Sequence, residues 1–157
     1  MSSFMSAWAA LLGNEGGYTV DDGGPTNWGI TEAVARRNGY SGDMRDLSRD
    51  VAMNIAQKEY WLPNHCDQFS DGVAFQVLDA AYNGGSPARW LQEAVGVPVD
   101  GVIGPVTIQA VNSANQDKVV MRFLSYRLTY LTSLSVWQTY GKGWSNRIAH
   151  NLLRAAS

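Results

Sequence analysis

The sequence lacks the features that mark several common classes of protein. Its single cysteine, Cys66, cannot form an internal disulfide, which excludes a small secreted domain stapled by disulfides. The apolar segment nearest the N-terminus, residues 4–12, is too short to span a membrane. It has no basic residue before it and no small-residue cleavage pattern, so it is a poor signal peptide. We therefore expect synthesis in the cytoplasm and a separate route of release for any action outside it.

Patterns for metal and nucleotide binding are also missing. His65, Cys66 and His150 do not have the paired spacing of a zinc site. The run Asp21–Gly24 lacks the alternating ligands and the final Glu of a calcium loop, and no phosphate-binding glycine loop ends in Lys. The serine-nucleophile motif G-x-S-x-G is absent as well. We expect neither a metal ion nor a cofactor.

Positive charge is scarce in the first half of the chain. Residues 1–81 hold five Lys or Arg against eleven Asp or Glu, whereas residues 82–157 hold seven against three. Phosphate binding needs a broad basic surface, so the acidic half argues against nucleic acid as a partner. From Lys118 onward the chain has six basic residues and no acidic one. These basic C-terminal helices could contact an anionic wall or membrane weakly, or simply form a solvated face.

Short helical patterns fill most of the 157 residues, 45% of which are hydrophobic, as expected for a globular domain. Glycine, proline and capping residues divide the chain. We expect helices over residues 4–13, 31–37, 49–61, 71–82, 87–95, 105–113, 117–138 and 144–155. The glycine-rich segment 16–29 predicts a loop or a short hairpin. The predicted fold is mainly α, a single domain in which the change of charge near residue 82 separates two lobes, 1–81 and 82–157.

Carboxylates are the candidates for chemistry that remain. Glu15 follows an apolar helix, and no Lys or Arg lies within twenty residues on either side. The negative end of the helix and partial burial would both favour its protonated form, which suits a general acid. Asp21 and Asp22 follow in a turn where solvent and backbone N–H groups favour the ionised form. Two carboxylates in such contrasting surroundings can cleave a glycosidic bond. On spacing alone, however, an exposed Glu and a polar turn explain these residues better.

The wider segment 15–31, EGGYTVDDGGPTNWGIT, resembles the signature of glycoside hydrolase family 108, the phage and prophage N-acetylmuramidases. The family pattern has a helix that ends in E-G-G-Y/F, then D-x-G-G-x-T and G-I-T. The resemblance assigns the catalytic acid to Glu15 and secondary catalytic roles to Asp21 and Thr26. The stretch between the two acids is shorter here than in the family. This leaves Asp21 and Asp22 as alternatives, and we prefer Asp21 because its offset to Thr26 matches.

The second half of the chain carries a resemblance of its own. Leu91-Gln92 followed by VGVPVDGVIGPVTIQAV, and then Y-G-K-G-W-x-N-R over residues 140–147, is similar to the peptidoglycan-binding segment of the same family. We expect this segment to complete the fold, with Val97, Val99, Val102 and Ile103 packed against the front lobe. The ordered matches span nearly the whole chain and imply a lysozyme-like fold.

The resemblance also implies a function. A phage or prophage endolysin would cleave the β-1,4 bond between N-acetylmuramic acid and N-acetylglucosamine, act as a monomer, and reach the periplasm after release through a holin. Peptidoglycan would be its partner. A lytic transglycosylase on the same bond and a non-catalytic peptidoglycan-binding protein are the alternatives.

Several polar and aromatic residues near the proposed catalytic loop are candidates for substrate binding. Tyr18, Asn27 and Trp28 flank the loop and could stack on sugars or bond them, although Trp28 could equally anchor the loop. Tyr82 and Asn83 end the helix predicted over 71–82. Asn83 could bond an N-acetyl group, or it could simply cap the helix. Asp79, inside that helix, is better explained as a buried structural acid than as the second carboxylate.

Overall fold

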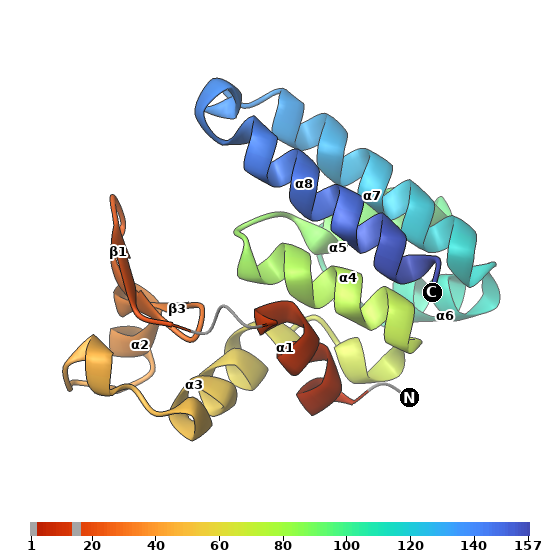
Figure 1. Cartoon of the computed structure of the whole chain (residues 1–157). Coiled ribbons are helices and arrows are strands. Elements are labelled where there is room, and N and C mark those ends of the chain that lie inside the picture. Colours follow the sequence, from red (N-terminus) through yellow and green to blue (C-terminus); the bar gives the residue numbers. More distant parts are fainter. Residues whose placement is uncertain (1–2, 14–16) are drawn as a thin grey trace.

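Helices dominate the computed structural model, which describes residues 3–13 and 17–157 (Figure 1). The helices are α1 (Phe4–Leu12), α2 (Glu32–Arg37), α3 (Arg49–Ala56), α4 (Asp71–Tyr82), α5 (Pro87–Val95), α6 (Pro105–Ser113), α7 (Gln116–Thr132) and α8 (Trp137–Ala155). The strands are β1 (Thr19–Asp21), β2 (Gly24–Asn27) and β3 (Ile30–Thr31). Short helical turns are η1 (Met44–Asp46), η2 (Gln57–Trp61) and η3 (Cys66–Gln68). None of the described helices is long and apolar enough to cross a membrane.

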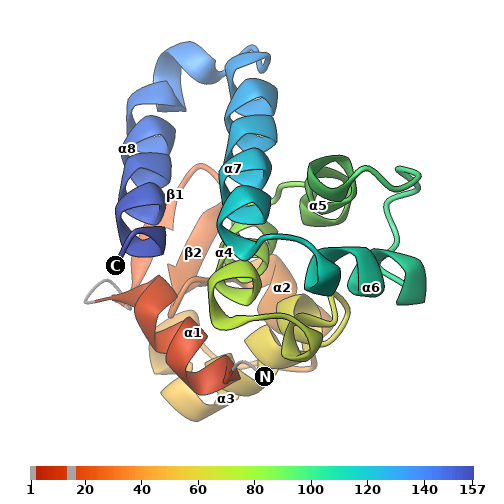
Figure 2. The same cartoon turned by 90° about the vertical axis from the view of Figure 1, so that its right-hand side faces the viewer.

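Helix α4 lies at the centre of the molecule, and its middle is buried on every side although it includes Gln76 and Asp79. Eight consecutive residues, 73–80, are buried. A helix without a polar face is stable only when other elements cover it all round. Helix α1 packs on one side of α4, and α5 and α7 pack on others (Figures 1 and 2). The end of α4 therefore has a fixed position relative to the rest of the chain.

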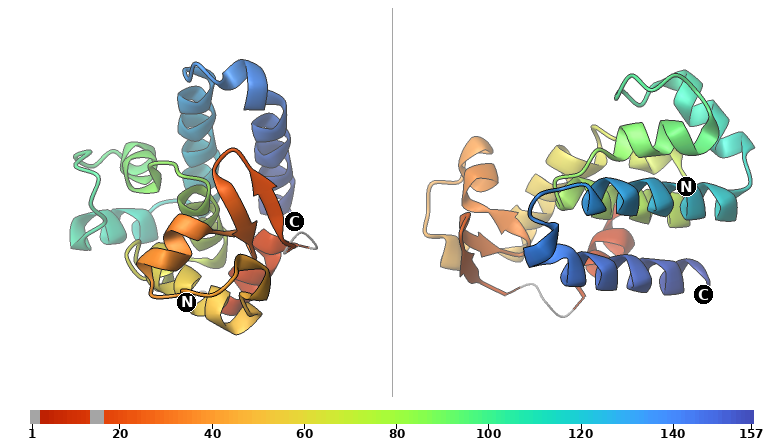
Figure 3. Two further views of the ribbon diagram at one scale, coloured as in Figure 1. Left: turned by 90° about the vertical axis from the view of Figure 1, so that its left-hand side faces the viewer. Right: turned by 90° about the horizontal axis from the view of Figure 1, so that it is seen from above.

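The glycine-rich segment after α1 forms a small antiparallel sheet with strand order β1-β2-β3. Asp21 pairs with Gly24 across a tight turn, in which the N–H of Gly23 donates to Asp21 Oδ1 at 2.8 Å. Gly24 has φ of +95°, a left-handed conformation that glycine adopts without steric cost. The sheet projects at one end of the molecule, with α2 and η1 packed against it (Figure 3).

Most predicted helix boundaries are confirmed. The bounds of α4, α5 and α6 are the predicted ones, and the side chains of Thr31 and Ser48 accept the N-cap bonds of α2 and α3. The helix predicted over 49–61 is α-helical only to Ala56 and continues as a π-helical turn, η2. Ser86 makes no side-chain cap, although Pro87 opens α5 as expected.

The prediction was wrong for the last two helices. Helix α7 ends at Thr132, where the hydroxyls of Thr132 and Ser133 donate to the carbonyls of Thr129 and Tyr130. Helix α8 then runs through Gly141 and Gly143, the glycines in the break expected between the helices over 117–138 and 144–155. A Cβ on Gly141 would lie 2.5 Å from Cε2 of Trp137. The glycine therefore leaves room for the Trp137 indole ring against the helix and does not end the helix. Together α7 and α8 form an antiparallel pair (Figure 1).

The loop between α5 and α6 is held by a buried glutamine and not by its valines. The expected packing is wrong for Val99 and Val102, which are exposed, and only Ile103 belongs to the core. Gln92 is 1% exposed, and its Oε1 accepts from the N–H groups of Asp100 and Gly101 at 3.1 and 3.0 Å. Its Nε2 donates to Asp100 Oδ1 at 2.8 Å. Gln92 of the L-Q motif therefore holds Asp100 and Gly101 of the V-D-G motif in place through hydrogen bonds.

Candidate active site

Three elements that are distant in sequence meet beside the sheet: the end of α1, the turn between β2 and β3, and the end of α4. Gly29, in the turn, has φ of +74°. A Cβ on Gly29 would lie 2.8 Å from Cε1 of Tyr82 and 3.4 Å from Cδ2 of Leu12. Only glycine allows this close approach without strain. The sheet is thus fixed against the C-terminal ends of α1 and α4.

Tyr82 connects the same two helices. The indole Nε1–H of Trp8 donates to the Tyr82 hydroxyl at 2.8 Å, and the Tyr82 ring lies 4.6 Å from that of Tyr60. Burial raises the pKa of Tyr82, since the phenolate would be desolvated. The half-buried ring is therefore a rigid neutral surface, and its predicted contact with sugar stays a prediction.

Asn27 and Trp28 attach the end of β2 to residues 44–47 through side-chain hydrogen bonds. Asn27 is buried, and its Nδ2 donates to the carbonyls of Met44 and Arg45 at 2.9 and 3.4 Å. Trp28 has φ of +54°, unusual for a residue other than glycine, and its Nε1–H donates to the Leu47 carbonyl at 2.9 Å. These contacts give Trp28 the anchoring role that the sequence left open. Contacts of either residue with substrate remain predictions.

Four more of the predicted site residues lie in the sheet or directly beside its first strand. The strand register pairs Thr26 with Thr19, and Thr19 is two residues from Asp21. Opposed residues and residues two apart share a face, so Asp21 and Thr26 lie on the same face of the sheet. Tyr18, just before β1, is 37% exposed, and the Arg45 guanidinium lies 5.6 Å from its ring centroid. Asp22 is exposed in the turn.

The proposed acid, Glu15, lies outside the described residues. In sequence it falls between Gly13, the C-cap of α1, and Gly17, which precedes the sheet. The first helix was predicted to stop at Gly13, and Gly13 is indeed the C-cap of α1. Its N–H donates to the Ala9 carbonyl at 3.0 Å.

Asn83 is the C-cap residue of α4, one of the two roles that the sequence gave it. Its Nδ2 donates to the Asp79 carbonyl at 2.7 Å, and its side chain is exposed. A contact with an N-acetyl group is untested by this geometry.

Asp79 is the buried structural acid that the sequence favoured. Its side chain is 1% exposed and accepts from Arg127 at 2.7 Å, Arg147 at 2.6 Å and Asn151 at 2.9 Å. Sequence reasoning missed these partners as a group. A signal existed, because an acid inside an apolar helix needs a counterion and the C-terminal third of the chain offers an excess of bases. Arg147 is the arginine of the G-K-G-W-x-N-R motif, which this ion pair explains.

A hollow of about 520 Å³ opens beside the end of α1. It is lined by residues 10–12 of α1 and its C-cap Gly13, by Phe75 and Asp79 of α4, and by Gly143, Asn146, Arg147, His150 and Asn151 of α8. Within residues 3–13 and 17–157, no group of three or more His, Cys, Asp or Glu side chains could hold a metal ion.

Comparisons with known proteins agree with this arrangement. The family described as Glycosyl hydrolase 108 matches residues 8–85, and a family described as Predicted Peptidoglycan domain matches residues 86–149. The solved structure of SagA from Brucella abortus is 33% identical and superposes with a TM-score of 0.87. That comparison covers 98% of this chain and 93% of the other. A search of curated proteins found no match.

A mainly α, lysozyme-like fold with these two segments in this order defines a glycoside hydrolase that acts on peptidoglycan. The chain belongs to glycoside hydrolase family 108. The family and the fold class predicted from the sequence are both confirmed.

Proposed function

We propose that the enzyme hydrolyses the β-1,4 bond between N-acetylmuramic acid and N-acetylglucosamine, as a muramidase. The observation that carries the proposal is the position of the segment E-G-G-Y…D-D-G-G-P-T…G-I-T. It lies within the residues matched by the hydrolase family and directly after α1, where the sheet presents Asp21 and Thr26 on one face.

In this mechanism Glu15 protonates the glycosidic oxygen as the bond to the sugar breaks. Asp21 then stabilises the positive charge that develops on the sugar ring, or it removes a proton from the attacking water. The Thr26 hydroxyl orients that water. One molecule of water is consumed and its hydroxyl joins the sugar. Where Asp21 stabilises the charge, ionised Glu15 takes the proton of the water; where Asp21 is the base, Asp21 takes that proton and Glu15 is reprotonated from solvent.

Substrate would lie along the junction described above. Tyr18 and the half-buried Tyr82 offer aromatic surfaces that sugar rings can contact. The exposed Asn83 can bond an N-acetyl group, and Asn27 and Trp28 keep the loop beneath the sugars in place.

We further propose the setting of a phage or prophage endolysin. The protein would be made in the host cytoplasm, act as a monomer on the wall after release through a holin, and approach it with the basic faces of α7 and α8. The lobes 1–81 and 82–157 would act as one domain, since α4 packs against both α1 and α7.

The test is Glu15→Gln, which keeps the shape of the side chain and removes its acidic proton. We expect it to lower the lysis of chloroform-treated Gram-negative cells by about 10²- to 10⁴-fold, the usual contribution of a general acid. Binding should persist when the variant is sedimented with purified walls. Glu93→Gln, an exposed glutamate on α5, is the matched control and should lyse cells normally.

A Glu15→Gln variant that clears cells as fast as the wild type would remove Glu15 from the mechanism. Mass spectrometry of the released sugars separates the two possible reactions on this bond. Hydrolysis adds one water, whereas a lytic transglycosylase leaves an anhydro sugar that is lighter by one water. Anhydro products alone would overturn the muramidase proposal.

A further inference from the structure

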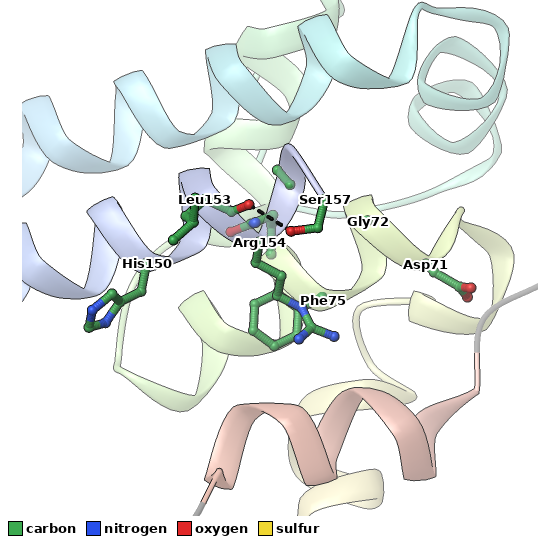
Figure 4. A pocket seen from close by; sticks show the side chains of 9 residues that line it. Asp71, Gly72, Phe75, His150, Leu153, Arg154 and Ser157 are labelled. Carbon is green, nitrogen blue, oxygen red and sulfur yellow. Dashed lines mark hydrogen bonds between the residues drawn. The ribbon is translucent and has the colours of Figure 1, made fainter.

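A second hollow, of about 660 Å³, lies between the first half of α4 and the C-terminal end of α8 (Figure 4). Its lining includes Asp71, Phe75 and Gln76 of α4, and His150 and Arg154 of α8. None of the catalytic or sugar-binding residues named above belongs to it.

The hollow contains a buried acceptor that the fold does not satisfy. The Gln76 side chain is 2% exposed, and its Oε1 has no hydrogen-bond partner among the described residues. Its Nε2 makes only a long bond, 3.4 Å, to the Asn151 carbonyl. A buried polar atom without a partner is costly, so natural proteins rarely keep one without a reason. Gln76 is one of the residues that line the hollow, so a small rotation of its amide would let this oxygen accept from an N–H donor bound there.

Opposite charges lie along the same hollow. The Arg154 guanidinium rests over the Phe75 ring, 4.3 Å from its centroid, and His150 lies one turn earlier on α8. Figure 4 shows Arg154 along the ring of Phe75, with the Asp71 carboxylate farther along α4. A ligand with a carboxylate at one end and an amino group at the other would match this distribution.

The hollow adjoins the one beside α1. Both are lined by Phe75 and His150, and the hollow beside α1 reaches Leu12 and Gly13. Gly13 lies two residues before Glu15 in the sequence. The two hollows therefore lie next to each other along α4 and α8, and we call them together the α4–α8 groove.

We propose that the α4–α8 groove binds the peptide stem of peptidoglycan. This inference rests on the proposed function, because the sugar that carries the stem must lie at the active site. A stem amide N–H donates to Gln76 Oε1, a stem carboxylate pairs with Arg154, and a free amino group faces Asp71. The sugars of the glycan are uncharged and would not pair with Arg154 or Asp71, whereas the peptide carries both carboxylate and amino groups. The peptide is therefore the part of the substrate that fits.

The direct test is calorimetric titration of the full chain with a soluble stem tetrapeptide that carries no sugar. We expect saturable binding that Arg154→Gln weakens by about tenfold, the usual effect of losing one charge-assisted contact. The matched control is Arg89→Gln, which removes the same charge from the exposed start of α5, away from α8 (Figure 2). It should bind the peptide like the wild type.

Gln76→Leu separates binding from folding. The variant should lose peptide affinity by about tenfold and still unfold at the wild-type temperature or above, since it removes an unsatisfied buried oxygen. Unchanged affinity in this variant, or equal affinity of the Arg154→Gln and Arg89→Gln variants, would overturn the proposal, as would absence of peptide binding by the wild type.

Hydrolysis gives an independent readout. Arg154→Gln should raise KM on intact peptidoglycan and leave KM unchanged on glycan strands stripped of peptide by an amidase. Equal effects on both substrates would contradict a peptide site. Peptide binding by a protein that cleaves neither substrate would refute the muramidase function and leave the peptide site standing.

Discussion

Gly29 is a single residue on which the geometry of the candidate site depends. Its left-handed backbone turns the chain between β2 and β3, and its missing side chain leaves room for the Tyr82 ring and Leu12. Tyr82 in turn holds Trp8 of α1. One glycine therefore fixes the sheet against the two helix ends between which we expect the substrate to bind.

We expect Gly29→Ala to lower the free energy of unfolding by about 2–4 kcal/mol, which combines left-handed strain with a steric clash. Urea denaturation measures this change. Gly39→Ala is the control, because Gly39 also has a positive φ, +88°, but a Cβ there meets nothing within 4 Å. It should lose only the strain, about 1–2 kcal/mol. Equal losses in the two variants would show that the contact with Tyr82 has no energetic weight.

At the scale of the elements, α8 shows how one contact can reverse a sequence signal. Gly141 and Gly143 suggest a break, and the structure has an unbroken helix with the Trp137 ring seated over Gly141. The ring groups with Trp144 at 6.1 Å between centroids. Trp137 and Trp144 can pack in this way only because residue 141 has no side chain.

Gly141→Ala and Gly143→Ala should therefore change stability in opposite directions. A Cβ at 141 collides with Trp137, which should cost about 1–3 kcal/mol, whereas no atom of the described residues lies within 4 Å of a Cβ at 143. At position 143 alanine should add about 0.5–1 kcal/mol through helix propensity. Thermal unfolding of the two variants checks this, and a stabilised Gly141→Ala variant would contradict the packing argument.

The same contrast explains how far the sequence could predict the fold. The helices over 71–82, 87–95 and 105–113 were predictable because their start and stop signals, such as Pro87 and Pro105, are local. The hidden features are those made by distant partners. Spacing alone could not reveal the ring of Trp137 over Gly141. Nor could it reveal the loop that Gln92 holds, since Gln92 reaches Asp100 only through the folded turn.

For the candidate site, the residues of the E-G-G-Y…D-D-G-G-P-T segment were accessible through the family resemblance, and the structure adds their setting. Asp21 and Thr26 share a face only once the strand register is known. The inward-facing roles of Asn27 and Trp28 depend on carbonyls of Met44 and Leu47, well beyond the segment. Sequence could name these side chains, but their hydrogen-bond partners are tertiary.

At the scale of the whole molecule, Asp79 joins parts of the chain that two different families match. The acid lies in the part matched by the hydrolase family, and Arg127 and Arg147 lie in the part matched by the peptidoglycan family. A buried carboxylate between two guanidinium groups is stable only while all three are present. The ion pairs therefore couple the two parts energetically.

We expect Asp79→Asn to lower the free energy of unfolding by about 3–5 kcal/mol, because it leaves buried Arg127 without a counterion. Chemical denaturation at neutral pH measures the loss, with the exposed Asp117→Asn as the control for the removal of one negative charge. Combining Asp79→Asn with Arg127→Met should cost less than the two single losses added together. Additive losses would mean that the two side chains are not coupled.

The shared ion pairs also constrain how this architecture can be recombined. In a chimaera that joins the first 85 residues to the second half of another family member, the partners of Asp79 would come from the new half. The chimaera can fold well only if the new half brings bases at positions 127 and 147 and an amide at 151. The two segments can be told apart as sequence patterns. Recombination can exchange one of them only if the partners of Asp79 are kept.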